Sequence, residues 1–528
     1  MQSPWGDEVV DGRYGGHRGL VFARRPRTFT ELLTGVERWR DRTFLVQGSR
    51  RVTTGEFFAA VAEARERLRA FGLHPGDRVM LLGHNSPDWV LGLWAAWSLG
   101  AVPVLGNRWW SVPEATHSLD LTAPRVVITD AAELVTDGTE ILDFASLSSC
   151  FRGAVIDRPE VPGPASEEDP AFILFTSGST GMPKAVELPF RALVANQQNV
   201  LARARQLPHL IAADGPQPVT LLSTPIFHIG AFATLITQTL IGGRVIFNVG
   251  RFDPAQVLAL IESERVQRWG AVPTMAARLL EHPDFDSHDL SSLRAFPLGG
   301  APVPPALLER LARRIPQLQG RGLANTWGMS EGAGFFTLAI GPDLERFPKT
   351  VGRVFPTVEL KIVEPSRDGT DDGAGEILVR SPTLMLGYLG IDGVDSGGTL
   401  DSDGWLHTGD LGHINGDGYL FIDGRSKDMV IRGGENIACP HVEAALMRHD
   451  DVIDAAVIGL PHPDLGEELA AVVVHRDGRA PTEEELAGHM AGEVAYFAVP
   501  TRWIIRTEPL PTVGTEKVDK RALAAEFR

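Results

Sequence analysis

Residues able to hold phosphate oxygens gather in the stretch 171–187, which reads AFILFTSGSTGMPKAVE. Its first five residues form an apolar run bounded by polar ones, as expected for a buried strand. A loop of small residues follows, whose hydroxyls and backbone N–H groups could surround anionic oxygens. The loop consists of Thr176, Ser177, Gly178, Ser179, Thr180 and Gly181. Lys184 adds a fixed positive charge, so the stretch predicts a phosphate-binding site.

The general pattern to compare with this loop is the P-loop GxxxxGK[ST]. Counting from Gly178 puts Lys184 at the right offset, but Pro183 replaces the second glycine and Ala185 replaces the Mg²⁺-binding hydroxyl residue. A flexible Ser/Gly linker is the other alternative. Because an apolar strand precedes the loop and Pro-Lys ends it, the stretch predicts a phosphate loop of another kind.

Three segments resemble signatures of one enzyme superfamily. TSGSTGMPK at 176–184 resembles the phosphate loop of the adenylate-forming enzymes, NTWGMSE at 325–331 resembles their adenine motif, and WLHTGD at 405–410 resembles their ribose motif. This superfamily includes acyl-CoA synthetases, aryl-CoA ligases, firefly luciferases and the adenylation domains of peptide synthetases. The likeness follows the family's order from about Thr28 onward. It implies ATP, Mg²⁺ and CoA as ligands and a small carboxylic acid as substrate.

The resemblance also implies roles for individual residues. Asn325 and Trp327 are expected to pack on adenine, and Ser330 to touch the α-phosphate. Glu331 is expected to hold Mg²⁺, because a hard cation prefers carboxylate oxygen. Asp410 would accept both ribose hydroxyls through its several lone pairs. The other cofactor-binding residues implied are Thr326, Gly328, Gly299, Gly300, Ala301, Arg425, Gly433 and Gly434.

Two glycine pairs in this set could let a ligand approach the backbone closely. Gly299 and Gly300 follow a predicted strand, where adenine or an acyl chain could pass. Gly433 and Gly434 lie in MVIRGGENI at 429–437, where a pantetheine arm could pass. A simple turn and a plain hairpin are the alternative interpretations of these two pairs.

The segment PIFHIGA at 225–231 predicts one wall of an acyl pocket. A lone histidine such as His228 is more often a packed residue, but PxFHxxG resembles the family segment that lies beside the carboxylate. The pocket residues expected are His228, Ile229, Gly230, Ala231, Phe232, Leu298, Gly322, Trp327 and Ala333. Most are apolar, so a hydrophobic acid is expected: fatty, aryl, terpenoid or steroid.

The family's catalytic lysine lies within PxTxxGK near the C-terminus, and the corresponding segment 511–517 reads PTVGTEK. Lys517 matches, whereas Val513 replaces the threonine and Glu516 the glycine. If the glycine site needs a positive φ, another residue costs about 1–2 kcal/mol there. A ligase that mainly thioesterifies a preformed acyl-AMP therefore remains an alternative. The catalytic residues implied are Lys517, Glu331, His228 and Lys184.

Within the superfamily an acyl-CoA synthetase is favoured over a carrier-protein-loading domain, because no carrier segment follows Lys520. A luciferase-like monooxygenase remains a weaker alternative. A non-catalytic protein that binds acyl-AMP or nucleotide is the alternative from another class. The five matched charged residues argue against it; they are Lys184, Glu331, Asp410, Arg425 and Lys517.

Composition limits the remaining possibilities. The chain has 528 residues, enough for several domains, with 43% apolar and 22% charged residues, as in a soluble globular protein. Its net charge of −17 lacks the basic footprint of a nucleic-acid-binding protein. Cys150 and Cys439 predict no disulfide framework, so a cytoplasmic location is expected. No apolar run is long enough to predict a membrane span. A homodimer is left open.

Alternating helices and strands precede the phosphate loop. Thr53 and Glu56 form a capping box before a predicted helix at 57–71, and a strand at 78–82 and a helix at 88–99 follow. Repeated units of this kind predict a mainly parallel, doubly wound α/β sheet. The strand-rich segment 352–388 predicts a small β subdomain.

The resemblance divides the chain into two domains. A large N-terminal domain, residues 1–426, is expected to hold two stacked doubly wound sheets and the β subdomain. A smaller, mobile α+β domain, residues 427–528, would swing about Lys427, because a hinge needs only a few residues that absorb backbone rotation.

Overall fold

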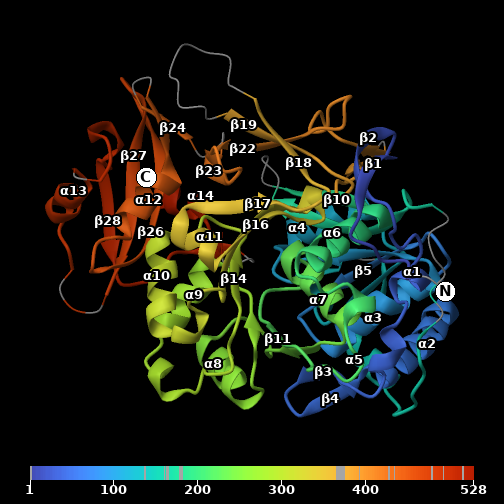
Figure 1. Ribbon diagram of the computed structural model, residues 1–528. Coiled ribbons are helices and arrows are strands. Elements are labelled where there is room, and N and C mark those ends of the chain that lie inside the picture. Colours follow the sequence, from blue (N-terminus) through green and yellow to red (C-terminus); the bar gives the residue numbers. More distant parts are fainter. Residues whose placement is uncertain are drawn as a thin grey trace.

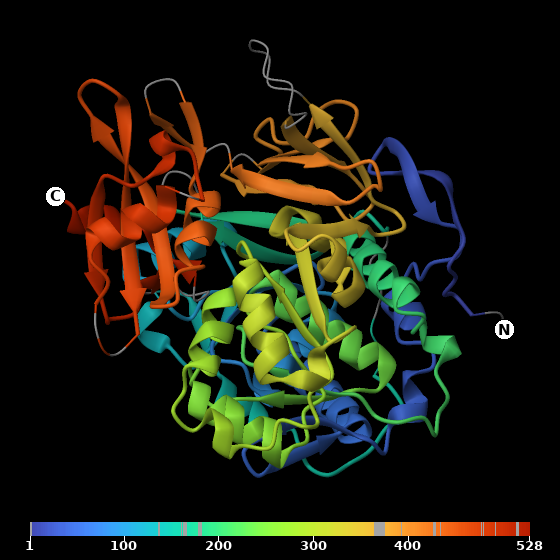
Figure 2. The ribbon, with the colours of Figure 1, turned by 60° about the vertical axis from the view of Figure 1, so that its left-hand side comes forward.

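The chain folds into a large N-terminal part and a smaller C-terminal part that packs against one side of it (Figures 1 and 2). The computed structural model describes residues 3–135, 138–159, 161, 166–177, 182–363, 375–391, 393–425, 429–432, 435–476, 478, 480–491, 493–513 and 517–528. The α/β class and the two-part organisation predicted from the sequence are confirmed.

The first sheet of the N-terminal part has eight strands, five of which run parallel. Its order is β21 (Gly393–Asp395), β20 (Gly387–Gly390), β10 (Pro183–Pro189), β9 (Pro170–Ser177), β6 (Val102–Gly106), β5 (Arg78–Leu82), β7 (Val126–Thr129) and β8 (Glu140–Asp143). The strands β9, β10, β20 and β21 pair antiparallel at one edge. Thr176 and Lys184, at the two ends of the predicted phosphate loop, are therefore paired across β9 and β10.

The second sheet is parallel except for its last strand. Its order is β13 (Arg268–Trp269), β11 (Val219–Leu222), β12 (Arg244–Phe247), β3 (Thr43–Gln47) and β4 (Arg50–Thr53). Isolated bridges from Arg268 to Ala295 and from Ala271 to Leu298 connect it to the third sheet. The doubly wound layers expected from the sequence thus continue into the strands that carry the adenine motif.

The third sheet differs from the prediction in one respect. Its order is β14 (Phe296–Gly299), β15 (Leu323–Met329), β16 (Gly334–Ile340), β17 (Thr350–Val354), β23 (Leu420–Arg425), β22 (Leu406–Ile414), β19 (Gly375–Arg380) and β18 (Glu359–Val363). The strands β17, β23, β22, β19 and β18 form the predicted β subdomain, and β17 joins it to β16. Its expected last strand, β20, pairs instead with β10 in the first sheet.

Helix α3 (Pro87–Leu99) shows how the core positions the phosphate loop. Ser86 caps its first turn, Pro87 starts it, and Gly100, at φ 80°, ends it. Its three tryptophans are almost completely buried. The indole of Trp97 donates a hydrogen bond of 2.7 Å to the carbonyl of Ala171 in β9. The helix therefore fixes the strand that leads into the loop.

The remaining N-terminal elements cover the sheets. They are β1 (Val9–Tyr14), β2 (His17–Phe22), α1 (Phe29–Leu32), α2 (Thr54–Ala70), α4 (Val112–Thr122), α5 (Phe144–Ser148), α6 (Phe190–Arg203), α7 (Ile229–Ile241), α8 (Pro254–Ser263), α9 (Pro273–Leu280), α10 (Pro305–Arg314) and α11 (Gly341–Arg346). The predicted capping box of α2 is present, with Thr53 and Glu56 each accepting a backbone hydrogen bond from the other.

The C-terminal part has its own sheet and its own apolar core. Its elements are β24 (Met429–Arg432), β25 (Glu435–Ala438), α12 (Cys439–Leu446), β26 (Val452–His462), β27 (Gly466–His475), α13 (Glu483–Ala491), β28 (Arg502–Arg506), β29 (Thr512–Val513), β30 (Lys517–Val518) and α14 (Lys520–Glu526). Lys427 lies outside the described residues. The boundary at 426/427 and the hinge stay predictions.

Charged groups connect the two parts. Glu281, which follows α9, forms ion pairs with Arg310 of α10 and with Arg476 beyond β27, at 3.0 Å for the second pair. Each apolar cluster of the described residues lies within one part. The C-terminal part is therefore held to α9 and α10 in a polar contact.

We expect Glu281→Ala to weaken this contact, because Arg310 and Arg476 would then face each other without a carboxylate between them. A partly exposed ion-pair network contributes about 1 kcal/mol, which corresponds to a roughly fivefold change in the docking equilibrium. Hydrogen exchange at α9 and β26 should become faster. Asp286→Ala breaks the Arg314 pair inside the N-terminal part and should leave β26 unaffected. Unchanged exchange in Glu281→Ala would contradict the expectation.

Candidate functional site

A cavity of about 3530 Å³ lies between the two parts of the chain and carries most of the motif residues. A typical pocket for one small ligand measures about 300–1,000 Å³. The cavity can therefore hold more than one ligand. The sequence-predicted residues that line it are Thr176, Lys184, His228, Ile229, Gly230, Ala231, Leu298, Gly299, Gly300, Ala301, Gly322, Asn325, Thr326, Trp327, Gly328, Ser330, Glu331, Asp410, Arg425 and Lys517.

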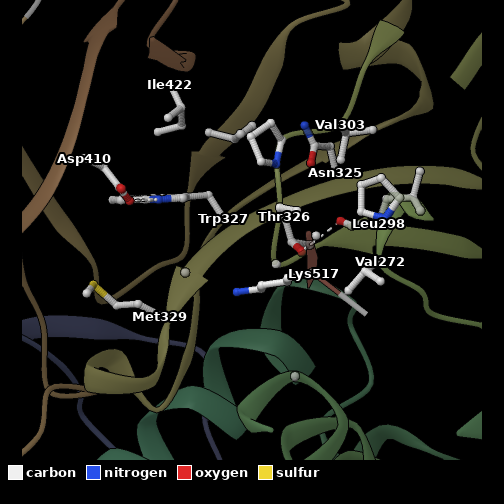
Figure 3. Close-up of a pocket in the computed structure, with 18 of the residues that line it drawn as sticks. Val272, Leu298, Val303, Asn325, Thr326, Trp327, Met329, Asp410, Ile422 and Lys517 are labelled. Carbon is white, nitrogen blue, oxygen red and sulfur yellow. Dashed lines mark hydrogen bonds between the residues drawn. The ribbon is translucent and has the colours of Figure 1, made fainter. Parts of the chain in front are cut away.

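Asp410 organises one end of the cavity (Figure 3). Its side chain is almost fully buried, at 2% exposure. The indole of Trp327 donates to one carboxylate oxygen at 2.7 Å, and the guanidinium of Arg425 donates to the other, also at 2.7 Å. The buried charge is thus paired, and each oxygen keeps a lone pair for a further donor. Asp410 fits the predicted role of accepting sugar hydroxyls.

The β14 and β15 strand ends form the floor beside Trp327. The Thr326 hydroxyl donates to the carbonyl of Leu298 at 3.1 Å, and the Asn325 amide donates to the carbonyl of Thr350 at 3.0 Å. A side chain at Gly299 would overlap the Thr326 hydroxyl, and Gly300 has φ 77°. The backbone at Gly299 therefore has no room for a side chain, and Gly300 lies next to the Lys517 side chain. The approach of a ligand to this pair stays a prediction.

Lys517 enters the cavity from the C-terminal part. A Cβ placed on Gly300 would lie 3.9 Å from its Cε atom. In Figure 3 its ammonium group points below Thr326 into the space next to Trp327. Burial among protein groups, together with nearby Arg425, lowers the pKa of Lys517 to about 8, against the opposing effect of Asp410 and Glu331. The side chain nevertheless stays open to the cavity, so an anion could reach it.

Glu331 is the candidate metal ligand. It lies in the short 3-10 helix Ser330–Gly332 at 7% exposure and lines the cavity. The hydroxyl of Tyr388 donates to its Oε1 atom at 2.8 Å. Within the described residues no group of three or more metal-ligating side chains occurs. One carboxylate fits Mg²⁺, which commonly takes one or two protein carboxylates together with substrate phosphates.

The β9–β10 hairpin brings the phosphate-loop residues to the cavity. Thr176 and Lys184 are opposite each other in the strand pairing, and both line the cavity. Gly178, Ser179, Thr180 and Gly181 lie outside the described residues, as do Gly433 and Gly434 and the substituted Glu516. The side chain of Ser177 is also not described. Their predicted roles stay predictions.

The acyl-wall prediction needs a correction. His228, at the start of α7, lines the cavity, and a Cβ on Gly230 would meet only Phe335, at 3.9 Å. Phe232, by contrast, is fully buried and packs on Phe172 with ring centroids 4.5 Å apart. The reason is that Gly230 and Phe232 lie on different faces of α7, and Phe232 faces the core.

Ala333 also lies in the apolar core rather than on the cavity wall, and its neighbour Gly334 takes that place. Arg251 and Tyr388 are among the lining residues that had no predicted role in the site. The guanidinium of Arg251 lies over the Trp109 ring at 5.8 Å. Tyr388 stands 57 residues from its partner Glu331, and no spacing pattern in the sequence marks it.

The pKa of Lys517 is directly testable. We expect its amine to lose its proton near pH 8, whereas an ordinary lysine does so near 10.4. Arg425→Ala should raise this pKa, because it removes a neighbouring positive charge, and Asp410→Asn should lower it. The rate of reductive methylation at Lys517, followed by mass spectrometry across pH 6–11 (about the range that separates the two values), measures the pKa. A wild-type midpoint close to 10.4 would contradict the expectation.

Comparison with known proteins gives a consistent result. The AMP-binding enzyme family matches residues 33–389, and the AMP-binding enzyme C-terminal domain matches residues 441–517. The chain is 35% identical to a feruloyl-CoA synthase from Amycolatopsis sp over 492 residues, which cover 92% of this chain and 96% of that protein. It is 31% identical to the long-chain-fatty-acid–CoA ligase FadD13 of Mycobacterium tuberculosis, over 90% and 93% of the two chains.

A solved structure supports the same assignment. The o-succinylbenzoate CoA synthetase MenE from Bacillus subtilis, in complex with the acyl-adenylate intermediate OSB-AMP, matches with a TM-score of 0.77 and 26% identity. The match covers 93% of this chain and 97% of that one. With two family models that match in the expected order, and with the motif residues collected around one cavity, the chain belongs to the AMP-binding enzyme family.

Proposed function

We propose that this protein is an AMP-forming acid–CoA ligase. It joins a carboxylic acid to ATP to give acyl-AMP and pyrophosphate, and then transfers the acyl group to CoA with release of AMP. The observation that supports this most directly is the arrangement around one cavity of Trp327, Asp410 and Glu331 from the N-terminal part and Lys517 from the C-terminal part.

Two steps are needed because a carboxylate is a poor acceptor for a thiol. Direct attack would have to expel a hydroxide-like group, whose parent acid has pKa 15.7. The acyl-AMP instead expels a phosphate ester whose parent acid has pKa ~6. The leaving group is thus less basic by roughly ten pK units. Adenylation therefore makes the thioester accessible.

In the proposed first step, a carboxylate oxygen attacks the α-phosphorus and pyrophosphate leaves. Asp410 and Trp327 hold the nucleoside at one end of the cavity, and Lys517 approaches the site of reaction next to Gly300. The ammonium charge of Lys517 stabilises the negative charge that builds up on the phosphate and carboxylate oxygens. Mg²⁺ held by Glu331 would neutralise phosphate charge when bound.

In the proposed second step, the CoA sulfur attacks the acyl carbon, AMP leaves, and the thiol proton passes to solvent. The thiol needs access to the cavity that the C-terminal part covers. The polar contact through Glu281 suits a domain that undocks, because interfaces of this kind separate more easily than apolar ones. Movement of the C-terminal part is therefore included in the proposal.

For the acid we propose an aryl or fatty acid. The wall beside His228 is largely apolar and includes Ile229, Gly230, Phe335 and Leu338. The relatives named above carry feruloyl-CoA synthase and long-chain fatty-acid–CoA ligase activities in their names. A hydrophobic acid that keeps its carboxylate near Lys517 fits both observations.

The test is a panel of aryl and fatty acids with ATP, Mg²⁺ and CoA, followed by mass spectrometry of the thioester. We expect Lys517→Ala to reduce acid-dependent ATP–pyrophosphate exchange by about 10²-fold to 10³-fold, because such a loss follows removal of one transition-state charge stabiliser. Thioester formation from a supplied acyl-AMP should persist. Lys361→Ala, which removes a lysine that stacks on Trp405, is the matched control.

Each other outcome decides against part of the proposal. Nucleotide binding without AMP release from any acid would indicate a non-catalytic binding protein. Conversion of acyl-AMP alone, with no use of free acid by the wild type, would indicate the ligase restricted to thioesterification. Unchanged exchange in Lys517→Ala would remove Lys517 from its role.

The compartment and the oligomeric state belong to the same proposal. Within the described residues no helix has the length and apolar character that a bilayer crossing needs. In the described part of the chain, Cys150 and Cys439 are both buried and form no disulfide, which suits the reducing cytoplasm. A homodimer is left open, and light scattering of the purified protein would measure the oligomeric state.

A further inference from the structure

Tyr388 lies between two residues of the proposed nucleotide site that come from distant parts of the chain. Its hydroxyl contacts the Glu331 carboxylate, and its ring faces the Lys184 ammonium. We propose that Tyr388 is a positioning residue for adenylation, which holds the metal-binding carboxylate in place and keeps it apart from the phosphate-loop lysine. This inference rests on the proposed function and adds to it a residue that the motifs do not contain.

Strand pairing fixes the position of the Tyr388 ring. Tyr388 lies in β20, directly opposite Val186 of β10. Lys184 stands two residues before Val186, so its side chain emerges on the same face of the sheet. The Nζ atom of Lys184 lies 4.9 Å from the centre of the tyrosine ring. The negative face of the ring attracts this ammonium and gives a flexible lysine a defined location.

The hydroxyl end of Tyr388 fixes Glu331. It donates to Oε1 at 2.8 Å, and the Thr399 side chain forms a hydrogen bond to the same phenol oxygen. The main chain adds a second link, because the N–H of Met385 donates to the Glu331 carbonyl at 2.9 Å. Because the hydrogen bond holds one carboxylate oxygen, the orientation of the other oxygen is also set. Hydrogen-bonded partners of this kind orient a metal ligand and thereby affect the affinity for the metal.

The ring also separates two opposite charges. A lysine and a glutamate in one cavity would attract each other, and a direct ion pair would occupy both. Across the part of the chain that the structure describes, no ion pair joins Lys184 to Glu331. The tyrosine contacts each of them and carries no charge, since its ordinary pKa is near 10. Glu331 thereby stays available for a cation and Lys184 for phosphate.

A purely structural tyrosine would affect stability and leave the cation requirement unchanged. Our proposal predicts a different pattern for Tyr388→Phe, which keeps the ring beneath Lys184 and removes the hydrogen bond to Glu331. The Mg²⁺ concentration for half-maximal acyl-AMP formation should rise roughly tenfold or more, because loss of an outer-shell partner has that effect on metal sites. Tyr388→Leu removes the ring as well, so the KM for ATP should also rise.

The matched control is Tyr419→Phe. Tyr419 donates to the Asp343 carboxylate at 2.7 Å, so the chain offers a second tyrosine–carboxylate pair of the same geometry away from the residues that line the cavity. Its loss should leave both the Mg²⁺ requirement and the KM for ATP unchanged. Thermal unfolding of all variants shows which substitutions only change stability.

A binding measurement separates this inference from the proposed function. Calorimetric titration with ATP, with and without Mn²⁺, needs no turnover. We expect Tyr388→Phe to bind metal-free ATP like the wild type and to lose most of the gain in affinity that Mn²⁺ gives. If Tyr388→Phe does not fold, Thr399→Val, which removes the other hydrogen bond to the phenol oxygen, should show a smaller loss in the same direction.

An unchanged Mn²⁺ effect in the folded Tyr388→Phe variant would overturn the inference and leave the ligase proposal intact. The same result in Thr399→Val would overturn it if Tyr388→Phe cannot be prepared. A wild type that forms no acyl-AMP from any acid would contradict the ligase proposal, whatever the titration shows.

Discussion

The site depends on one buried carboxylate. Asp410 is shielded from solvent, and its charge is tolerated because Trp327 and Arg425 each donate to one of its oxygens. An unpaired charge at such a position costs about 3–5 kcal/mol. The pairing therefore ties β15, which carries the adenine motif, to β22 and β23. It also places Arg425 near Lys517, so the same contact sets the electrostatics of the lysine.

The site shows how an acidic protein can attract a polyanion. The whole chain has a net charge of −17, yet Lys184, Arg425 and Lys517 all line one cavity. Burial and the neighbouring Arg425 lower the pKa of Lys517 to about 8, so its charge depends on what the cavity contains. An arriving phosphate favours the protonated lysine. The charge is therefore strongest when the nucleotide is present.

Local signals in the sequence were enough to predict many elements. The strand at 78–82 is β5, and the predicted helix at 88–99 is α3 with one residue added, because Ser86, Pro87 and Gly100 act within one turn of the helix ends. Contacts between distant segments could not be predicted in this way. The β26–β27 pairing is an example, since it joins Val452–His462 to Gly466–His475 through contacts that no local signal specifies.

In the candidate site, too, local motifs predict some residues, whereas contacts between distant segments place others. Trp327, Glu331, Asp410 and Lys517 come from separate motifs, and the fold brings them around one cavity. Tyr388 was expected to close the β subdomain, because nothing in the residues near it indicates that β20 pairs with β10. Phe232 was placed on the pocket wall from its proximity to His228, but helical geometry turns it toward the core. The direction of the side chain, rather than the residue type, decides whether such a residue lines the cavity or packs in the core.

One contact between the two parts of the chain is made by charged groups, and the chemistry supplies a reason for it. Lys517 must reach the α-phosphate in one step, and a bulky thiol must reach the acyl carbon in the next. Separation of an apolar interface would expose apolar surface to water, which is unfavourable. Such an interface would therefore hold Lys517 in place permanently. The Arg310–Glu281–Arg476 contact is weaker than an apolar interface would be, because water can readily solvate its charged groups when they separate. A polar contact outside the cavity and a separate core within the C-terminal part together allow both steps in one protein.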